Sequence, residues 1–160
     1  MAGRRLPDLG PRGEGWFVVQ LLLLAGVALA GLLGPDWSGP ARVGALGLGA
    51  ILIALGGGLA VRGVVDLGTN LTVFPKPRGG ATLVDGGAYR LVRHPIYGGL
   101  ILGAVGWSLA TASWAALAGA VVLALFLRLK SVREELWLAA RFDGYDSYRA
   151  RTRRFIPWLY

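Results

Sequence analysis

The 160-residue chain contains no cysteine and a single histidine, His94. The absence of cysteine excludes disulfides, thiol nucleophiles and metal sites with thiolate ligands. With no thiolate to assist it, one histidine is too few for a zinc site. We therefore predict no metal centre, and any chemistry must use oxygen-bearing side chains, cations, aromatic rings and the one imidazole.

Charged residues are also scarce. They make up 16% of the chain, against 54% hydrophobic residues, and the mean hydropathy is positive. This balance lies outside that of ordinary soluble domains. Three blocks carry no charged residue: Trp16–Gly34, Val43–Val61 and Ile96–Leu127. Blocks of this length are typical of membrane-spanning helices, so we expect a bilayer protein.

Acidic residues are the scarcer charged type, with 9 Asp and Glu against 17 Lys and Arg and a formal net charge of +8. The cations flank the apolar blocks and form no recognisable nucleic-acid module, so we predict no nucleic-acid partner. Cations in such positions are kept on the cytoplasmic side and attract anionic membrane lipids. We predict an inner-membrane protein with both termini in the cytoplasm. The flanking cations are Arg4, Arg5, Arg12, Arg62, Lys76, Arg78, Arg90, Arg93, Arg128, Lys130, Arg133 and the cluster Arg149–Arg154.

The predicted fold class is all-α: a polytopic membrane bundle of about four transmembrane helices with a cytoplasmic amphipathic C-terminal helix. The third block is too long for one span, and Thr111–Trp114 offers a break, while Pro95 suits the first turn of a helix. The first span also resembles a signal peptide with a cleavage site at Ala28–Ala30, but its apolar run continues to Leu33. The predicted elements of this single domain, 1–160, are spans at 16–34, 43–63, 95–112 and 114–130, a cofactor loop at 66–97 and a tail at 131–160.

Small residues recur at every fourth position in each predicted span, a pattern that lets helix backbones approach closely in lipid. We predict that these ladders pack against other helices of the same monomer. They are Gly26, Ala30 and Gly34; Ala50, Ala54 and Gly58; Gly99 and Gly103; and Ala116, Ala120 and Ala124.

Polar groups gather in Leu83–Gly99, at the end of the long connection 66–97. Pro75 and Pro77 oppose regular structure there, because proline removes a donor and restricts the preceding residue. Long irregular connections in compact proteins are usually functional or disordered, and the apolar and aromatic content of this one favours order. The pair Gly86-Gly87 predicts backbone close to a ligand.

Lys130 and Glu134 lie four residues apart and therefore share one helix face. Because the last two spans form a hairpin that leaves one membrane face and returns to it, the loop ending at His94 should meet this helix face. Ionisable groups at the ends of spanning helices are functional candidates. The structural alternatives are snorkelling for Glu134 and helix capping for His94.

These residues resemble isoprenylcysteine carboxyl methyltransferases and the related phospholipid methyltransferases. The resemblance covers about 66–157, and the spacing from Phe142 to Tyr145 is one residue shorter than is usual in the family. It rests on Gly87-Ala88-Tyr89, Arg93–Gly98, Glu134-Glu135, Leu138, Phe142, Tyr145, Tyr148 and Arg154–Pro157.

The resemblance implies S-adenosylmethionine as methyl donor, bound at the cytoplasmic membrane face by the loop and helices. The sequence has no strand followed by G-x-G-x-x-G, the Rossmann fingerprint. The implied catalytic residues are His94, Tyr97 and Lys130, and Lys130 replaces an arginine that contacts the substrate carboxylate in the prenylcysteine enzymes. The implied cofactor-binding residues are Thr82, Leu83, Val84, Tyr89, His94, Pro95, Tyr97 and Glu134.

Methyl transfer from a sulfonium depends mainly on aligning the acceptor, the methyl group and the leaving sulfur. Glu134 should hold the donor's ammonium group, and Tyr89 or Tyr97 should face the sulfonium. His94 is either a contact to the donor or a base for an amine or thiol acceptor. The expected acceptor is a lipophilic small molecule or lipid with a carboxylate, amine or similar group.

Two other functions fit parts of the pattern. The basic tail suits a noncatalytic membrane protein whose loop binds anionic lipid or a partner. The second alternative is a membrane reductase of the sterol reductase type, which shares its architecture with the methyltransferase family and would bind NADPH.

Overall fold

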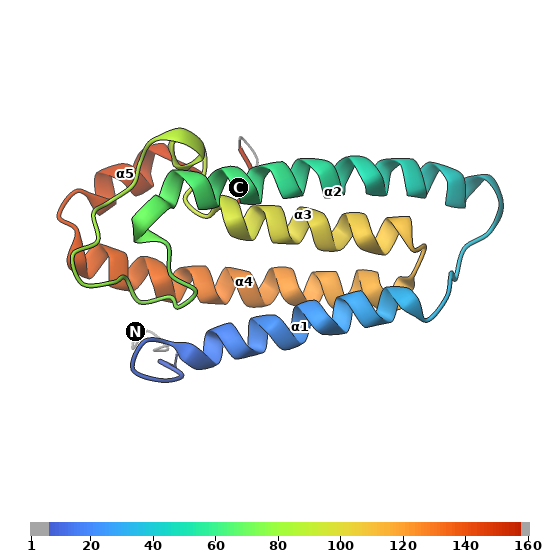
Figure 1. Ribbon diagram of the computed structural model, residues 1–160, viewed down its shortest axis with the longest axis horizontal. Coiled ribbons are helices and arrows are strands. Elements are labelled where there is room, and N and C mark those ends of the chain that lie inside the picture. Colours follow the sequence, from blue (N-terminus) through green and yellow to red (C-terminus); the bar gives the residue numbers. More distant parts are fainter. Residues whose placement is uncertain (1–6, 158–160) are drawn as a thin grey trace.

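The computed structural model describes residues 7–157, so the predicted cytoplasmic residues Arg4 and Arg5 lie outside the described part of the chain. Four helices lie side by side and alternate in direction: α1 Glu14–Leu32, α2 Gly39–Leu67, α3 Pro95–Ala110 and α4 Trp114–Arg141 (Figure 1). Three short elements complete the chain: η1 Gly68–Asn70, η2 Gly87–Arg90 and α5 Tyr145–Arg151. Residues 7–157 form helices and loops with no strand, which confirms the all-α bundle.

Three helices, α1, α2 and α4, are long and apolar enough to cross a bilayer. Helix α3 has 16 residues, shorter than the roughly 20 that a perpendicular span needs. Helix α2 extends beyond the predicted 43–63 at both ends, and α4 continues past position 130 as one helix of 28 residues. The predicted amphipathic C-terminal helix is therefore the end of α4 followed by the short α5. Large apolar side chains such as Leu22, Val61 and Leu125 are exposed on the long helices, as a lipid-facing surface requires.

The helix starts follow from local sequence. Pro40 and Pro95 occupy the first turns of α2 and α3, where proline's missing N–H leaves no bond unmade. The Ser113 hydroxyl caps α4 by accepting from the Ala116 N–H at 3.2 Å. At the end of the bundle where α4 begins, Asp36 joins the connection between α1 and α2 to the connection between α3 and α4. Its carboxylate accepts from the backbone N–H of Trp114 at 2.6 Å.

Glycines allow α2 and α3 to pack backbone to backbone. A Cβ added at Gly56 would lie 2.6 Å from the Gly99 carbonyl oxygen, and one added at Gly49 would lie 2.5 Å from the Gly106 carbonyl oxygen. The predicted small-residue ladders are confirmed at Gly99, Ala116 and Ala120, which are buried. The prediction is wrong at Gly26, Gly34, Ala50, Ala54 and Gly58, which are exposed. Ala30, Gly103 and Ala124 are partly buried, and the Gly103 backbone lies against Gly56 of α2.

We expect Gly56→Ala to destabilise the protein by about 1 to 3 kcal/mol, the usual cost of overpacking, because the α2 and α3 backbones must separate. The matched control is Gly57→Ala, since a Cβ at Gly57 meets nothing within 4 Å. That change should be neutral or slightly stabilising, because alanine favours the helix. Thermal unfolding in detergent measures both effects, and equal melting temperatures for the two variants would contradict this packing.

The polar loop and the end of α4 meet at one end of the bundle (Figure 1). Helix α2 packs most extensively on α3, and α1 packs on α4. The Asp66 carboxylate, near the end of α2, accepts from the Ala88 N–H at 2.7 Å and so holds η2 in place. Gly87 has φ +56° and lies against this carboxylate, where a Cβ would collide. Gly87 therefore serves the contact with Asp66, whereas a Cβ at Gly86 would meet nothing within 4 Å. The approach of this backbone to a ligand stays a prediction.

Candidate active site

A cavity of about 340 Å³ lies at the loop end of the bundle, within the size range of small-molecule sites. Its walls come from α1, the end of α2, the loop 70–84, the start of α3, the end of α4 and α5. All predicted site residues but one line this cavity, namely Thr82, Leu83, Val84, Tyr89, His94, Tyr97, Lys130 and Glu134. The exception is Pro95, which is buried at the start of α3 and packs against Gly63 of α2.

Glu134 presents its carboxylate to the cavity. Its Oε2 accepts a hydrogen bond from the Tyr97 hydroxyl at 2.8 Å and lies 3.8 Å from His94 Nδ1. The side chain keeps 23% of its surface exposed. The imidazole and the Tyr97 ring stack in parallel, with centroids 5.3 Å apart. An anionic group held by one hydroxyl retains lone pairs for a cationic ligand.

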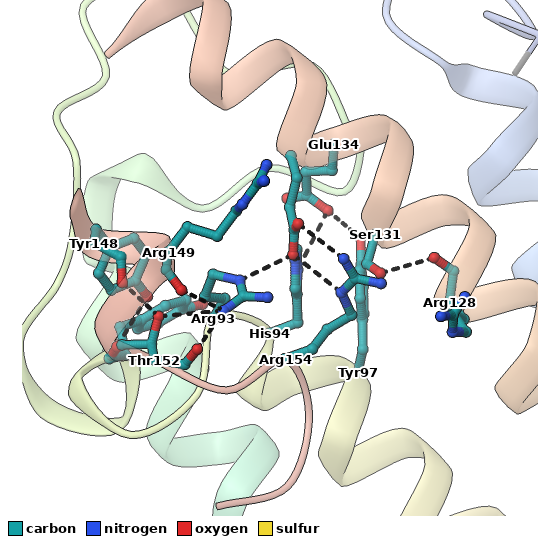
Figure 2. Close-up of polar contacts among 12 residues, drawn as sticks. Arg93, His94, Tyr97, Arg128, Ser131, Glu134, Tyr148, Arg149, Thr152 and Arg154 are labelled. Atoms are coloured by element: carbon teal, nitrogen blue, oxygen red, sulfur yellow. Dashed lines mark hydrogen bonds and ion pairs between the residues drawn. The ribbon is translucent and has the colours of Figure 1, made fainter. Parts of the chain in front are cut away.

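Glu135, the next residue, is buried and has a different set of partners. Its carboxylate accepts from Arg93 Nε at 3.0 Å, from Arg154 Nη2 at 3.0 Å and from His94 Nε2 at 3.1 Å. Figure 2 shows the Arg93, His94 and Arg154 side chains converging from the loop and the C-terminal segment. The sequence analysis did not predict that Glu135 joins these three side chains. The adjacent Glu134 and Glu135, followed by a basic tail, were the signal that could have indicated it.

These contacts also orient the imidazole. Because Nε2 of His94 faces the Glu135 carboxylate, the surroundings favour the tautomer with the proton on Nε2. Nδ1 is then the nitrogen on the Glu134 side. His94 is 6% exposed and stands at the residue before α3, but its side chain makes no capping bond to that helix. His94 is therefore the N-cap residue of α3 by position, but its side chain contacts the two glutamates and does not cap the helix.

The C-terminal segment 149–157, called the C-terminal strap below, is hydrogen-bonded to the loop beside the site. The backbone N–H groups of Arg93 and His94 donate to the carbonyls of Arg153 and Arg154 at 2.8 and 2.9 Å. The Arg93 guanidinium also donates to the carbonyls of Arg149 and Thr152 (Figure 2). The basic tail up to Pro157 therefore packs partly on the site, in addition to any interfacial anchoring.

Lys130 is the buried cation of the cavity, with 1% of its surface exposed. Its ammonium donates to Gln20 Oε1 at 2.6 Å and lies 5.2 Å from the centroid of the Tyr97 ring. Within residues 7–157 no ion pair joins it to a carboxylate, and Glu134 stands one helical turn further on. Gln20 of α1 is a second residue that the sequence analysis missed. A buried cation paired mainly with a neutral amide can receive an anionic ligand.

The other side of the cavity is aromatic and apolar. Tyr89, Tyr145 and Tyr148 form a buried cluster with Leu138 and Phe142 packed against it. The Tyr148 hydroxyl donates to the Tyr89 carbonyl at 2.8 Å. Burial raises the pKa of all three tyrosine hydroxyls above the usual range, so they remain neutral donors.

Residues 45–144 match the family model of phospholipid methyltransferases, which is more than half of the chain. The chain belongs to the phospholipid methyltransferase family. The resemblance predicted from the motifs is thus confirmed. The family match includes the loop, the start of α3 and Glu134, whereas Gln20, Tyr148 and Arg154 lie outside it. The structure therefore adds two parts of the site that the family match does not cover: the cavity wall from α1 and the C-terminal strap.

The protein is also similar to the cobalt-zinc-cadmium resistance protein CzcN of Cupriavidus metallidurans, with 40% identity over 83 residues. The alignment covers 49% of the chain and 37% of that relative. In the part of the chain that the structure describes, no group of three or more His, Asp or Glu side chains is placed to hold a metal ion.

Proposed function

We propose that this phospholipid methyltransferase family member transfers a methyl group from S-adenosylmethionine to a lipophilic acceptor at the cytoplasmic membrane face. The observation that carries the proposal is the meeting of Glu134 with the His94–Tyr97 segment around one cavity at the end of the bundle. The family match supports the reaction class.

The cavity residues fit the methyl donor. The Glu134 carboxylate is suited to the ammonium group through a charge-assisted hydrogen bond. The rings of Tyr89 and Tyr97 line the same cavity and suit a sulfonium through cation–π attraction. When bound, S-adenosylmethionine supplies an already activated methyl group. The protein's own work is then to bind both partners, align them and exclude water.

Lys130 is assigned to the acceptor. Its ammonium is buried, lies beside the Phe17 and Tyr97 rings and has a neutral partner, so an anionic group on the acceptor would complete its surroundings. A carboxylate acceptor attacks directly and needs no base. For an amine acceptor, Nδ1 of His94 is the nitrogen positioned to take a proton, while Glu135 holds the other nitrogen.

The test of this function is incubation of the purified protein with a methyl-labelled donor and a membrane lipid extract. A labelled lipophilic product that depends on the protein is the expected result. If the protein binds lipid but labels nothing, the noncatalytic alternative replaces this proposal. If NADPH binds and displaces the methyl donor from the cavity, the reductase alternative replaces it.

We expect Lys130→Met to lower kcat/KM for the acceptor by about tenfold or more, the scale of one charged hydrogen bond. Donor affinity should stay close to that of the native protein, because Glu134 is untouched. Leu129→Ala is the control, since Leu129 is an exposed apolar neighbour on the same helix. Labelling rates with the identified acceptor, together with donor titrations, separate the two effects. A loss of donor affinity in Lys130→Met would move Lys130 to the donor's side of the cavity.

A further inference from the structure

Tyr145 is the first residue of α5 and one of the most buried side chains of the protein, with 1% of its surface exposed. It lines the cavity and packs edge-to-face on Tyr148, with ring centroids 5.9 Å apart. Its backbone N–H donates to the Phe142 carbonyl at 3.0 Å, which fixes the turn from α4 into α5. The ring is therefore held rigidly at the cavity wall.

The Tyr145 hydroxyl is buried but, within residues 7–157, has no hydrogen-bond partner. The hydroxyls of Tyr97 and Tyr148, which line the same cavity, are both paired, with Glu134 and with the Tyr89 carbonyl. An unpaired buried hydroxyl destabilises the fold, and native structures rarely keep one without a reason. A ligand in the cavity can supply the missing acceptor.

The residues packed around the Tyr145 ring indicate which part of a ligand this side of the cavity meets, while the charges of Glu135, Arg93 and Glu134 act on the hydroxyl itself. Tyr145 belongs to the aromatic cluster, against which Leu83, Val84 and Leu138 also pack. These side chains give this part of the cavity an aromatic and apolar lining that suits a heteroaromatic ring. The charged groups Lys130 and Glu134 are assigned to the acceptor and to the ammonium end of the donor. Because burial raises the pKa of Tyr145, the hydroxyl keeps its proton and acts as a donor.

We infer that the Tyr145 hydroxyl donates a hydrogen bond to a ring nitrogen of the adenine base of the methyl donor. The inference rests on the proposed function and goes beyond it, because it names the moiety that the aromatic side of the cavity recognises. Tyr145 is then a binding residue that selects for the base.

The test compares S-adenosylhomocysteine with its deaza analogues, in each of which one adenine ring nitrogen is replaced by C–H. In the native protein we expect one analogue to bind about two- to tenfold more weakly than the parent, the range for one neutral hydrogen bond. In Tyr145→Phe the parent should lose the same factor, and that analogue should bind no more weakly than the parent. Calorimetry on the purified full chain gives all the affinities.

Tyr148→Phe is the matched control, because it removes a hydroxyl that is already paired with the Tyr89 carbonyl. This variant should keep the native discrimination among the analogues, whatever its absolute affinity. If Tyr145→Phe binds the parent as tightly as the native protein does, or keeps the native discrimination, the inference is overturned while the proposed function stands. If the native protein does not bind S-adenosylhomocysteine at all, the proposed function itself fails.

Discussion

Glu134→Ala is expected to weaken binding of S-adenosylmethionine by about 1.5 to 3 kcal/mol, the scale of a hydrogen bond to a charged group. This corresponds to roughly a 10- to 150-fold rise in Kd. The reason is that the Glu134 carboxylate lines the cavity and accepts one hydrogen bond, from Tyr97, so that it can also accept from the ammonium group of the donor. Calorimetric titration of the donor into the purified protein measures the change.

The same substitution should leave the fold intact, which separates a binding role from a structural one. The Glu134 side chain is partly exposed and is not an ion-pair partner of any arginine within residues 7–157. The melting temperature should therefore stay within a few degrees of the native value. Glu134→Gln, which keeps the shape and removes the charge, should lose most of the affinity that Glu134→Ala loses. Native affinity in both variants would contradict the assignment.

Glu135→Ala is expected to destabilise the protein by about 3 to 5 kcal/mol, the usual cost of removing one partner from a buried ion pair. The change strips the carboxylate from Arg93 and Arg154, whose side chains are largely buried beside it. It also removes the hydrogen-bond partner of His94 Nε2. Denaturation in detergent should show a clear fall in melting temperature, with weaker donor binding as a secondary effect.

The adjacent glutamates thus make a matched pair of experiments. Glu135→Gln should be intermediate, because an amide oxygen still accepts one hydrogen bond but no longer neutralises the two arginines. A native melting temperature for Glu135→Ala would refute the role of this carboxylate in joining the loop, α4 and the C-terminal strap. So would a result in which Glu134→Ala is the less stable of the two variants.

The sequence predicted the architecture and the meeting of the site segments for physical reasons. Apolar blocks of spanning length define the helices, and a hairpin that crosses and returns must bring the His94 loop to the end of α4. The i, i+4 spacing of Lys130 and Glu134 puts both on one helix face, and both line the cavity. These features depend on local pattern and chain connectivity alone.

Other features depend on tertiary contacts that spacing does not specify. Adjacent helix residues point about 100° apart, so Glu134 and Glu135 face different partners, and only the folded C-terminal segment brings Arg154 to the second. Helix α2 is so rich in glycine that several fourfold ladders are possible. The glycines that pack on α3 are instead Gly49, Gly56 and Gly63, which lie seven residues apart, and not the predicted ladder of Ala50, Ala54 and Gly58. Gln20 became visible as a site residue only through its contact with Lys130.

The most direct measurement of the central claim is titration of S-adenosylmethionine into the purified, folded protein, followed by calorimetry. The account predicts saturable binding at one site, weakened in Glu134→Ala and retained in Leu129→Ala. The absence of binding at millimolar donor, with native thermal unfolding in the same sample, would contradict it.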